Sequence, residues 1–86
     1  MSPEDLTRMG HMLESAREAV ALIKNKCRQD LDAERILSLA LVRLLEIVGE
    51  AASRVSNTTR LQFSDIPWAQ IVSLRNRLIH GYDRWI

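Results

Sequence analysis

Two residues near the C-terminal end of the sequence, Arg75 and His80, have side chains suited to acid–base chemistry with charge stabilisation. A histidine has an ordinary pKa of about 6.5, so His80 could donate or accept a proton near neutral pH. An arginine stays charged at any physiological pH, and its planar guanidinium can hold two oxygens of a phosphate or carboxylate. We therefore treat the segment around these two residues as the candidate site.

The position of Arg75 in its predicted helix is unusual. At 100° per residue, it falls inside an arc of apolar side chains formed by Ile71, Leu78 and Ile79. Burying a guanidinium without partners costs several kcal/mol, so Arg75 needs a carboxylate, a bound anion or a cleft open to water. It could reach the bundle edge, pair structurally with Glu46 or Glu50, or serve a function. The sequence leaves these alternatives open.

The spacing of the two residues favours two copies of the chain. Five positions apart, Arg75 and His80 lie about 140° apart around an ideal helix and about 7.5 Å apart along it. They would not readily meet at one group from a single straight helix, whereas Asn76 and His80 share a face. If two copies meet across a two-fold axis, each copy's Arg75 and His80 can line one shared cleft. The geometry therefore predicts a homodimer, provided that these residues are functional.

Three helices are expected to position these residues. In the first, Ser2 is the N-cap, Pro3 takes the first helical position and Asp5 completes a capping box; it ends near Lys24. Its apolar stripe is predicted from helical spacing and contains Leu6, Met9, Leu13, Ala16, Val20 and Ile23.

The second helix is predicted from Asp32, as N-cap, to Val55. Apolar residues nearly encircle it, which is typical of a central helix or one that contacts a second chain, and we expect this helix to be both. The polar residues 56–65 are interpreted as a loop. The third helix begins with Ser64 or Asp65 as its cap, carries Pro67 in its first turn and ends near His80, where Gly81 would stop it.

Length and composition predict one all-α domain over residues 1–86, an antiparallel helical bundle. The residues are 47% hydrophobic but only 5% aromatic, which favours helices over a β-sandwich. Because the net charge of the protein is only +1, any nucleic acid would have to bind a local basic patch such as Arg75, Arg77 and Arg84. A single cysteine and no Cys/His cluster give no reason to expect a metal or another cofactor. Without a signal peptide or an apolar membrane span, we expect a cytoplasmic protein.

Three segments carry a resemblance to a known family: IVGEAASRVS at 47–56, DIPWAQIVSLRNRLIHGYD at 65–83 and, within it, RNRLIHGY at 75–82. Together they resemble the HEPN superfamily, and specifically the HepT-like toxins that are encoded beside a minimal nucleotidyltransferase (MNT) antitoxin in type VII-like toxin–antitoxin pairs. An arginine and a histidine at this spacing alone would be a weak match. The three segments in order are more specific, and the resemblance covers essentially the whole chain.

The resemblance implies a homodimeric, metal-independent endoribonuclease in which Arg75 and His80 match the catalytic pair. Asn76 would orient the RNA substrate, with Glu50 and Arg77 in supporting positions. The 2′-hydroxyl of RNA would be the nucleophile, His80 would move protons and Arg75 would stabilise charge on phosphorus. The expected products are a 2′,3′-cyclic phosphate and a 5′-hydroxyl.

The resemblance also implies a role for Tyr82, which matches the tyrosine that accepts AMP from the partner nucleotidyltransferase. Added phosphates beside Arg75 and His80 would repel RNA and silence the toxin. The relatives generally continue past this tyrosine into another helix, whereas this sequence stops at Ile86, so we expect a member that lacks this C-terminal helix and is truncated, naturally short or decayed. Two alternatives remain: a non-catalytic dimeric binding module that presents substrate to the nucleotidyltransferase, and a structural dimer in which Arg75 pairs with Glu46 or Glu50.

Overall fold

The computed structural model describes the backbone of residues 1–85 and the side chains of residues 1–74, 76 and 77. The described chain is helical and contains no strand, which confirms the all-α prediction. Its elements are α1 (Pro3–Ile23), α2 (Arg28–Ala33), α3 (Arg35–Ser53), α4 (Asn57–Gln62) and α5 (Trp68–Trp85). The three long helices correspond to the three that the sequence predicted.

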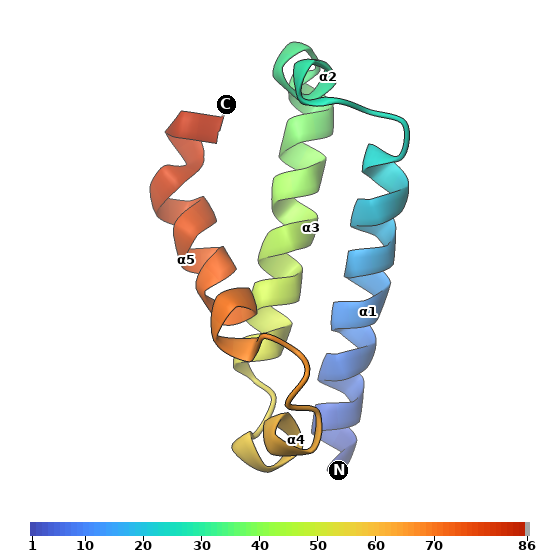
Figure 1. Ribbon diagram of the computed structural model, residues 1–86, viewed down its shortest axis with the longest axis vertical. Coiled ribbons are helices and arrows are strands. Elements are labelled where there is room, and N and C mark those ends of the chain that lie inside the picture. The colour runs from blue at the N-terminus through green and yellow to red at the C-terminus, as the bar shows by residue number, and fades with distance from the viewer. Residues whose placement is uncertain (86) are drawn as a thin grey trace.

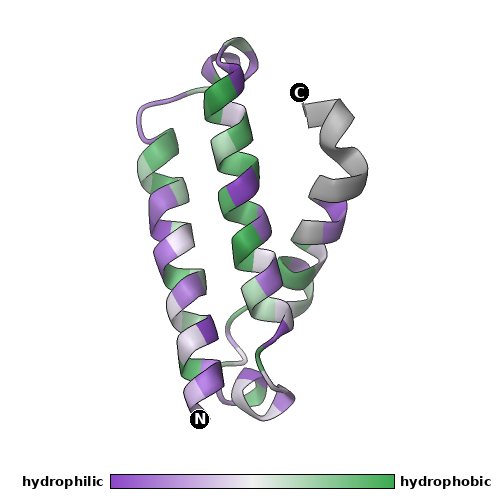
Figure 2. Ribbon diagram, turned by 180° about the vertical axis from the view of Figure 1, so that it is seen from behind, coloured by the Kyte–Doolittle hydropathy of each residue, from purple (hydrophilic) through white to green (hydrophobic). Residues whose placement is uncertain are grey.

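The three long helices run antiparallel, with α3 in the middle (Figure 1). Helix α3 packs against both α1 and α5, as expected for a helix that is apolar on two sides. Its apolar character is visible along most of its length in Figure 2. The short helices α2 and α4 lie at opposite ends of α3 (Figure 1). The prediction of a central second helix is therefore confirmed.

The start of α1 follows the sequence prediction in part. The hydroxyl of Ser2 accepts a hydrogen bond from the backbone N–H of Asp5 at 3.1 Å, and Pro3 occupies the first turn. The predicted capping box is wrong in its second half, because the Asp5 carboxylate is bonded to residues of a distant segment. After α1, Asn25 takes a positive φ of 63°, a conformation that asparagine tolerates, and the chain turns into α2.

The Asp5 carboxylate ties the first turn of α1 to the start of α4. It accepts hydrogen bonds from the backbone N–H of Ser56 at 3.1 Å, the Ser56 hydroxyl at 2.5 Å and the Thr59 hydroxyl at 2.6 Å. Asp5 and Thr59 are both buried. These hydrogen bonds lower the pKa of Asp5 from 3.8 to about 2, the bond from the Ser56 side chain most strongly. The ionised carboxylate is thus the form that the fold stabilises.

The apolar stripe predicted for α1 coincides only in part with its buried face, since Met9 and Ala16 are half-buried and Met9 packs against the core cluster. The residues that α1 buries are Asp5, Met12, Ser15 and Ala19, whereas the stripe residues Leu6, Leu13, Val20 and Ile23 are exposed. Helical spacing identified an apolar face correctly. It could not tell whether α3 or another partner covers that face.

The segment before the central helix also differs from the prediction. Asp32 is not the cap of a long helix but lies inside the short helix α2, and α3 begins at Arg35. Helix α2 starts where the backbone N–H of Cys27 donates to the Asp30 carboxylate at 2.8 Å, which lowers the pKa of Asp30. The Ser38 hydroxyl then donates to the carbonyl oxygen of Leu31 and joins α3 to α2. This local bonding forms a corner in the chain that periodicity does not reveal.

The predicted loop at residues 56–65 contains α4, which Ser56 caps. Within α4, the Arg60 side chain donates to the backbone carbonyl oxygens of Val55 at 3.0 Å and Ala52 at 2.9 Å. The Ala52 carbonyl lies in the last turn of α3, where a cation is favourable, and Val55 lies just beyond the end of that helix. The Arg60 guanidinium also lies 5.8 Å from the centre of the Trp68 ring. Arg60 therefore connects the end of α3 to the first residue of α5.

The core gathers where α5 begins. Trp68 is buried, and its indole N–H donates to the carbonyl oxygen of Phe63 at 3.0 Å. It packs in a cluster with Met12, Ala51, Ala52 and Val55. The helix that follows runs to Trp85, so the prediction that Gly81 ends it is wrong. None of the helices in the described range 1–85 is long and apolar enough to cross a membrane.

Replacing Asp5 with alanine should lower the melting temperature by several degrees, because three donors from Ser56 and Thr59 lose their acceptor. Asp32→Ala is a matched control, since Asp32 is exposed and forms only a 3.9 Å ion pair with Arg28. Thermal unfolding followed by circular dichroism measures both variants. Equal melting temperatures for the two would contradict the assigned role of Asp5.

The stability that Asp5 contributes is also predicted to depend on pH. Because the pKa of Asp5 is depressed to about 2, its contribution is fully present above the ordinary value of 3.8 and is lost as the pH falls toward 2. The difference in stability between the wild type and Asp5→Ala should therefore shrink over that range. A difference that stays constant from neutral pH down to pH 2 would be inconsistent with the bonded carboxylate.

Candidate active site

The predicted catalytic pair and the predicted AMP acceptor all lie on α5. Arg75, His80 and Tyr82 are residues of this one continuous helix, which begins at the buried Trp68. Their side chains lie outside the described residues, so the arrangement of Arg75 relative to His80 or to Glu46 stays a prediction. Arg84, the third arginine of the predicted patch, is likewise outside them. The regular rise of α5 fixes how far apart these positions are along the helix axis.

Two predicted supporting residues, Asn76 and Arg77, are described and exposed. They follow a stretch of α5 in which Ile71, Val72 and Leu74 are half-buried. An exposed amide and an exposed guanidinium at neighbouring positions are available to a ligand that approaches α5 from solvent. Neither is used by a hydrogen bond or ion pair within the described part of the chain.

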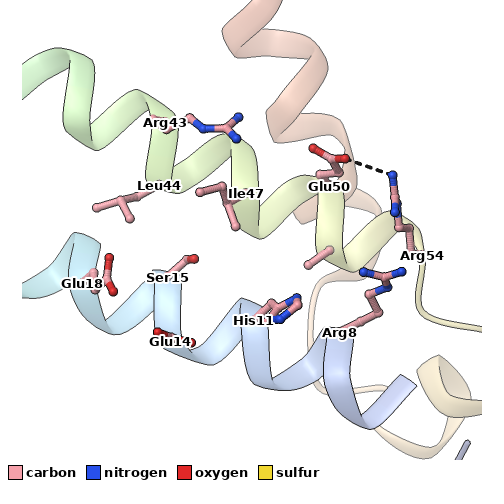
Figure 3. A pocket seen from close by; sticks show the side chains of 11 residues that line it. Arg8, His11, Glu14, Ser15, Glu18, Arg43, Leu44, Ile47, Glu50 and Arg54 are labelled. Atoms are coloured by element: carbon pink, nitrogen blue, oxygen red, sulfur yellow. Dashed lines mark hydrogen bonds and ion pairs between the residues drawn. The ribbon is translucent and has the colours of Figure 1, made fainter. Parts of the chain in front are cut away.

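The remaining supporting residue, Glu50, lies on α3 at the rim of a polar cleft between α1 and α3 (Figure 3). Its carboxylate accepts from the Arg54 guanidinium at 3.1 Å, one turn further along α3. Glu46 is similarly 3.9 Å from the Arg43 guanidinium. Glu46 and Glu50, the two predicted structural partners of Arg75, thus each have an arginine neighbour on their own helix.

The cleft has a volume of about 470 Å³ and collects charges that sequence reasoning did not bring together. Its charged lining residues are Arg8, His11, Glu14, Glu18, Arg43, Glu50 and Arg54. Three arginines face three glutamates, so the cleft is no strongly positive anion site. Its only sequence signal is the placement of these residues on the polar faces of two helices, which is also typical of ordinary solvated surface. We therefore assign it no chemistry.

Among the side chains that the structure describes, no group of three or more histidine, cysteine, aspartate or glutamate residues is placed to hold a metal ion. Asp5 and Asp30, the acids with depressed pKa values, bond to the starts of α4 and α2. Their perturbation has a structural cause, hydrogen bonding to the charged form. The candidate chemistry therefore stays with α5.

Comparison with known proteins assigns the chain to a family. The model of the family described as "Ribonuclease HepT-like" matches residues 12–84. The chain belongs to the HepT-like family. The match includes Glu50 and all of the candidate residues on α5, so the residues singled out above lie inside the region that defines this HEPN-superfamily family.

Three relatives of this HepT-like chain are named as ribonucleases. A "Putative RNase" of Methanocaldococcus jannaschii is 37% identical over 71 residues, which cover 83% of this chain and 65% of the relative. A "Probable ribonuclease HepT" of Thermococcus cleftensis is 34% identical, with 81% of this chain and 67% of the relative covered. A "Putative RNase" of Caldanaerobacter subterraneus is 33% identical, with 84% and 64% covered.

The chain therefore spans about two thirds of the length of the relatives it matches. No solved structure matches it significantly. The comparisons show the family and the all-α fold class, and the relatives are named as ribonucleases.

A double-mutant cycle should determine whether Glu50 interacts with Arg54 or with Arg75. We expect Glu50→Gln and Arg54→Ala to couple by about 0.3–0.5 kcal/mol, weakening with salt, because their side chains are 41% and 54% exposed. Urea unfolding of the single and double variants measures this coupling. The parallel cycle of Glu50→Gln with Arg75→Ala should give a smaller coupling energy. A coupling above about 2 kcal/mol there would make Arg75 the structural partner of Glu50.

Proposed function

We propose that this HepT-like chain is an endoribonuclease and the toxin of a toxin–antitoxin pair. The observation that carries the proposal is the family match over residues 12–84 together with an arginine, a histidine and a tyrosine in RNRLIHGY. Relatives that are named as ribonucleases support it. The exposed Asn76 and Arg77 support it further, because they offer hydrogen-bond donors to a phosphate chain beside the catalytic positions.

The proposed reaction needs no metal. His80 would take the proton of the 2′-hydroxyl as general base while that oxygen attacks the adjacent phosphorus. The bond from phosphorus to the 5′-oxygen then breaks, and a general acid donates a proton to the leaving 5′-oxygen. Arg75 would hold the non-bridging oxygens and stabilise the charge that develops on them. The products are a 2′,3′-cyclic phosphate and a 5′-hydroxyl.

A homodimer is part of the proposal because of helix geometry. On α5, Arg75 and His80 are separated by about 140° of rotation and about 7.5 Å of rise. A second copy of α5 across a two-fold axis would add its own pair from the opposite side of a shared cleft. The catalytic set would then combine residues of both copies, with Asn76 orienting the RNA.

Cleavage of a labelled single-stranded RNA in the presence of EDTA should be lost in His80→Ala, with a fall of about 10²-fold or more. His11→Ala is the matched control, since His11 is the other histidine of the chain and lies exposed on α1. A substrate with a 2′-deoxy residue at the cleavage position should bind and stay intact. Activity that survives His80→Ala would remove this residue from catalysis, and binding without cleavage by the wild type would favour the binding-module alternative.

We further propose that a partner nucleotidyltransferase silences the chain by transferring AMP to Tyr82. The phenolic oxygen would attack the α-phosphorus of ATP, pyrophosphate would leave, and the new phosphodiester would place negative charge two residues from His80. RNA would then be repelled from the positive groups that bind it. This part of the proposal rests on the resemblance of the segment RNRLIHGY to the HepT-like toxins.

Mass spectrometry after incubation with an MNT-type nucleotidyltransferase and ATP should find AMP on Tyr82, the only tyrosine in the chain. Tyr82→Phe should cut RNA as the wild type does and should resist silencing by the transferase. AMP found on the Tyr82→Phe protein would mean that another residue is the acceptor.

A further inference from the structure

The positive charge of this chain is concentrated on the helix that carries the candidate residues. Helix α5 contains three arginines and one aspartate, whereas α1 contains two arginines and four acidic residues. The segment 66–82 has no aspartate or glutamate, although the whole chain has 11 acidic residues. Because the net charge of the chain is only +1, this is a local feature of α5, and it favours an anionic ligand along that helix.

Three polar residues of α5 form a row on the face that points away from the core. At 100° per residue, Gln70, Ser73 and Arg77 fall within an arc of about 60° on the side opposite the buried Trp68. Gln70 and Arg77 are exposed, and Ser73 is half-buried. Helix α5 lies at an edge of the three-helix arrangement, so a ligand has access to this face from solvent (Figure 1). We call these three residues the polar row.

The groups in the polar row match the repeating parts of an RNA backbone. The Arg77 guanidinium donates hydrogen bonds and carries the charge that suits a phosphate. The Gln70 amide can both donate and accept. The Ser73 hydroxyl donates to the backbone carbonyl oxygen of Gln70 at 2.9 Å, which leaves its own oxygen to accept from a ribose 2′-hydroxyl. Contacts of this kind position a strand without reading its sequence.

The polar row leads along α5 to the position of His80. His80 comes ten residues after Gln70, which is about 15 Å along the helix axis, and three residues after Arg77, which is about 4.5 Å. A stacked strand advances about 3.4 Å per nucleotide, so the longer distance corresponds to about four nucleotides. The row is therefore long enough to hold the nucleotides on one side of a phosphate that reacts at His80.

We propose that Gln70, Ser73 and Arg77 bind the ribose–phosphate backbone of a single RNA strand, over about four nucleotides on one side of the cleaved bond. They are positioning residues, because they hold the strand and leave the proton transfers to His80. The place of the cleaved bond rests on the proposed function, whereas binding of RNA to the row can be measured without cleavage.

The first test measures the charge contact of Arg77. In a His80→Ala background, which keeps the RNA intact, Arg77→Ala should reduce the slope of log affinity against log salt concentration by about 0.7, because one phosphate contact is lost. Arg17→Ala is the matched control, since Arg17 is an exposed arginine on α1. Fluorescence anisotropy of a labelled single-stranded RNA over a salt series measures the slope. Equal slopes for the two arginine variants would overturn the proposal.

The second test measures the uncharged contact of Gln70 in the same background. Gln70→Ala should weaken RNA binding about threefold to tenfold without changing the salt slope, because a hydrogen bond and no charge is lost. Gln62→Ala is the matched control, since Gln62 is an exposed glutamine at the end of α4. Circular dichroism checks that both variants stay helical. Equal affinities of the two variants would remove Gln70 from the RNA-binding surface.

The third test measures the contact of Ser73 with ribose. Ser73→Ala should reduce the preference for RNA over DNA of the same sequence by about threefold, because DNA has no 2′-hydroxyl to donate. Ser53→Ala is the matched control, since the Ser53 hydroxyl also donates to the carbonyl oxygen three residues before it, that of Glu50. Anisotropy with the two labelled strands measures the preference. An unchanged preference in Ser73→Ala would contradict the ribose contact.

The last test uses cleavage and therefore also bears on the proposed function. Lengthening the RNA on one side of the cleaved bond should lower KM until about four nucleotides are present, with kcat unchanged. Gln70→Ala should lose this gain and should cleave the shortest substrate as the wild type does. A gain that persists in Gln70→Ala would overturn the proposed path of the strand. A wild type that cuts no RNA would remove the proposed function, and the three binding tests would still decide whether the row binds RNA.

Discussion

A buried carboxylate at the start of α1 organises the end of the molecule from which the candidate site extends. By accepting from Ser56 and Thr59, Asp5 fixes α4 against α1. Helix α4 in turn carries Arg60, which donates to the carbonyl oxygens of Ala52 in the last turn of α3 and of Val55 just after it, and lies against Trp68. Because Trp68 opens α5, the direction of the helix that carries the candidate residues depends on this chain of contacts.

The parts of the fold that sequence predicted are those that local rules decide. Ser2 and Pro3 mark a helix start by themselves, and the two-sided apolar pattern of α3 requires a central position. The predictions were wrong where contacts between residues distant in the sequence determine the structure. Six-residue α4 is polar and has little helical periodicity, and it exists because Asp5, Val55 and Ala52 bond to it. The stripe of α1 looked like a buried face because periodicity does not identify the partner.

The candidate site was located by residue type and spacing rather than by fold. A guanidinium placed among apolar positions of α5 is costly unless something compensates it. Glu46 and Glu50 have local partners in Arg43 and Arg54, which reduces their need for Arg75. Gly81, interpreted as a stop signal, is instead inside α5, since one glycine costs a helix only about 1 kcal/mol. His80 and Tyr82 are thus part of the same helix as Arg75.

The central claim is that Arg75 of one copy works with His80 of another, and mixing two inactive variants tests it most directly. Arg75→Ala and His80→Ala should each be inactive alone, whereas a mixed dimer keeps one intact arginine–histidine set across its two-fold axis. The account predicts that ribonuclease activity returns on mixing, in proportion to the heterodimer counted by native mass spectrometry. A heterodimer that forms in quantity and stays as inactive as either parent would contradict it.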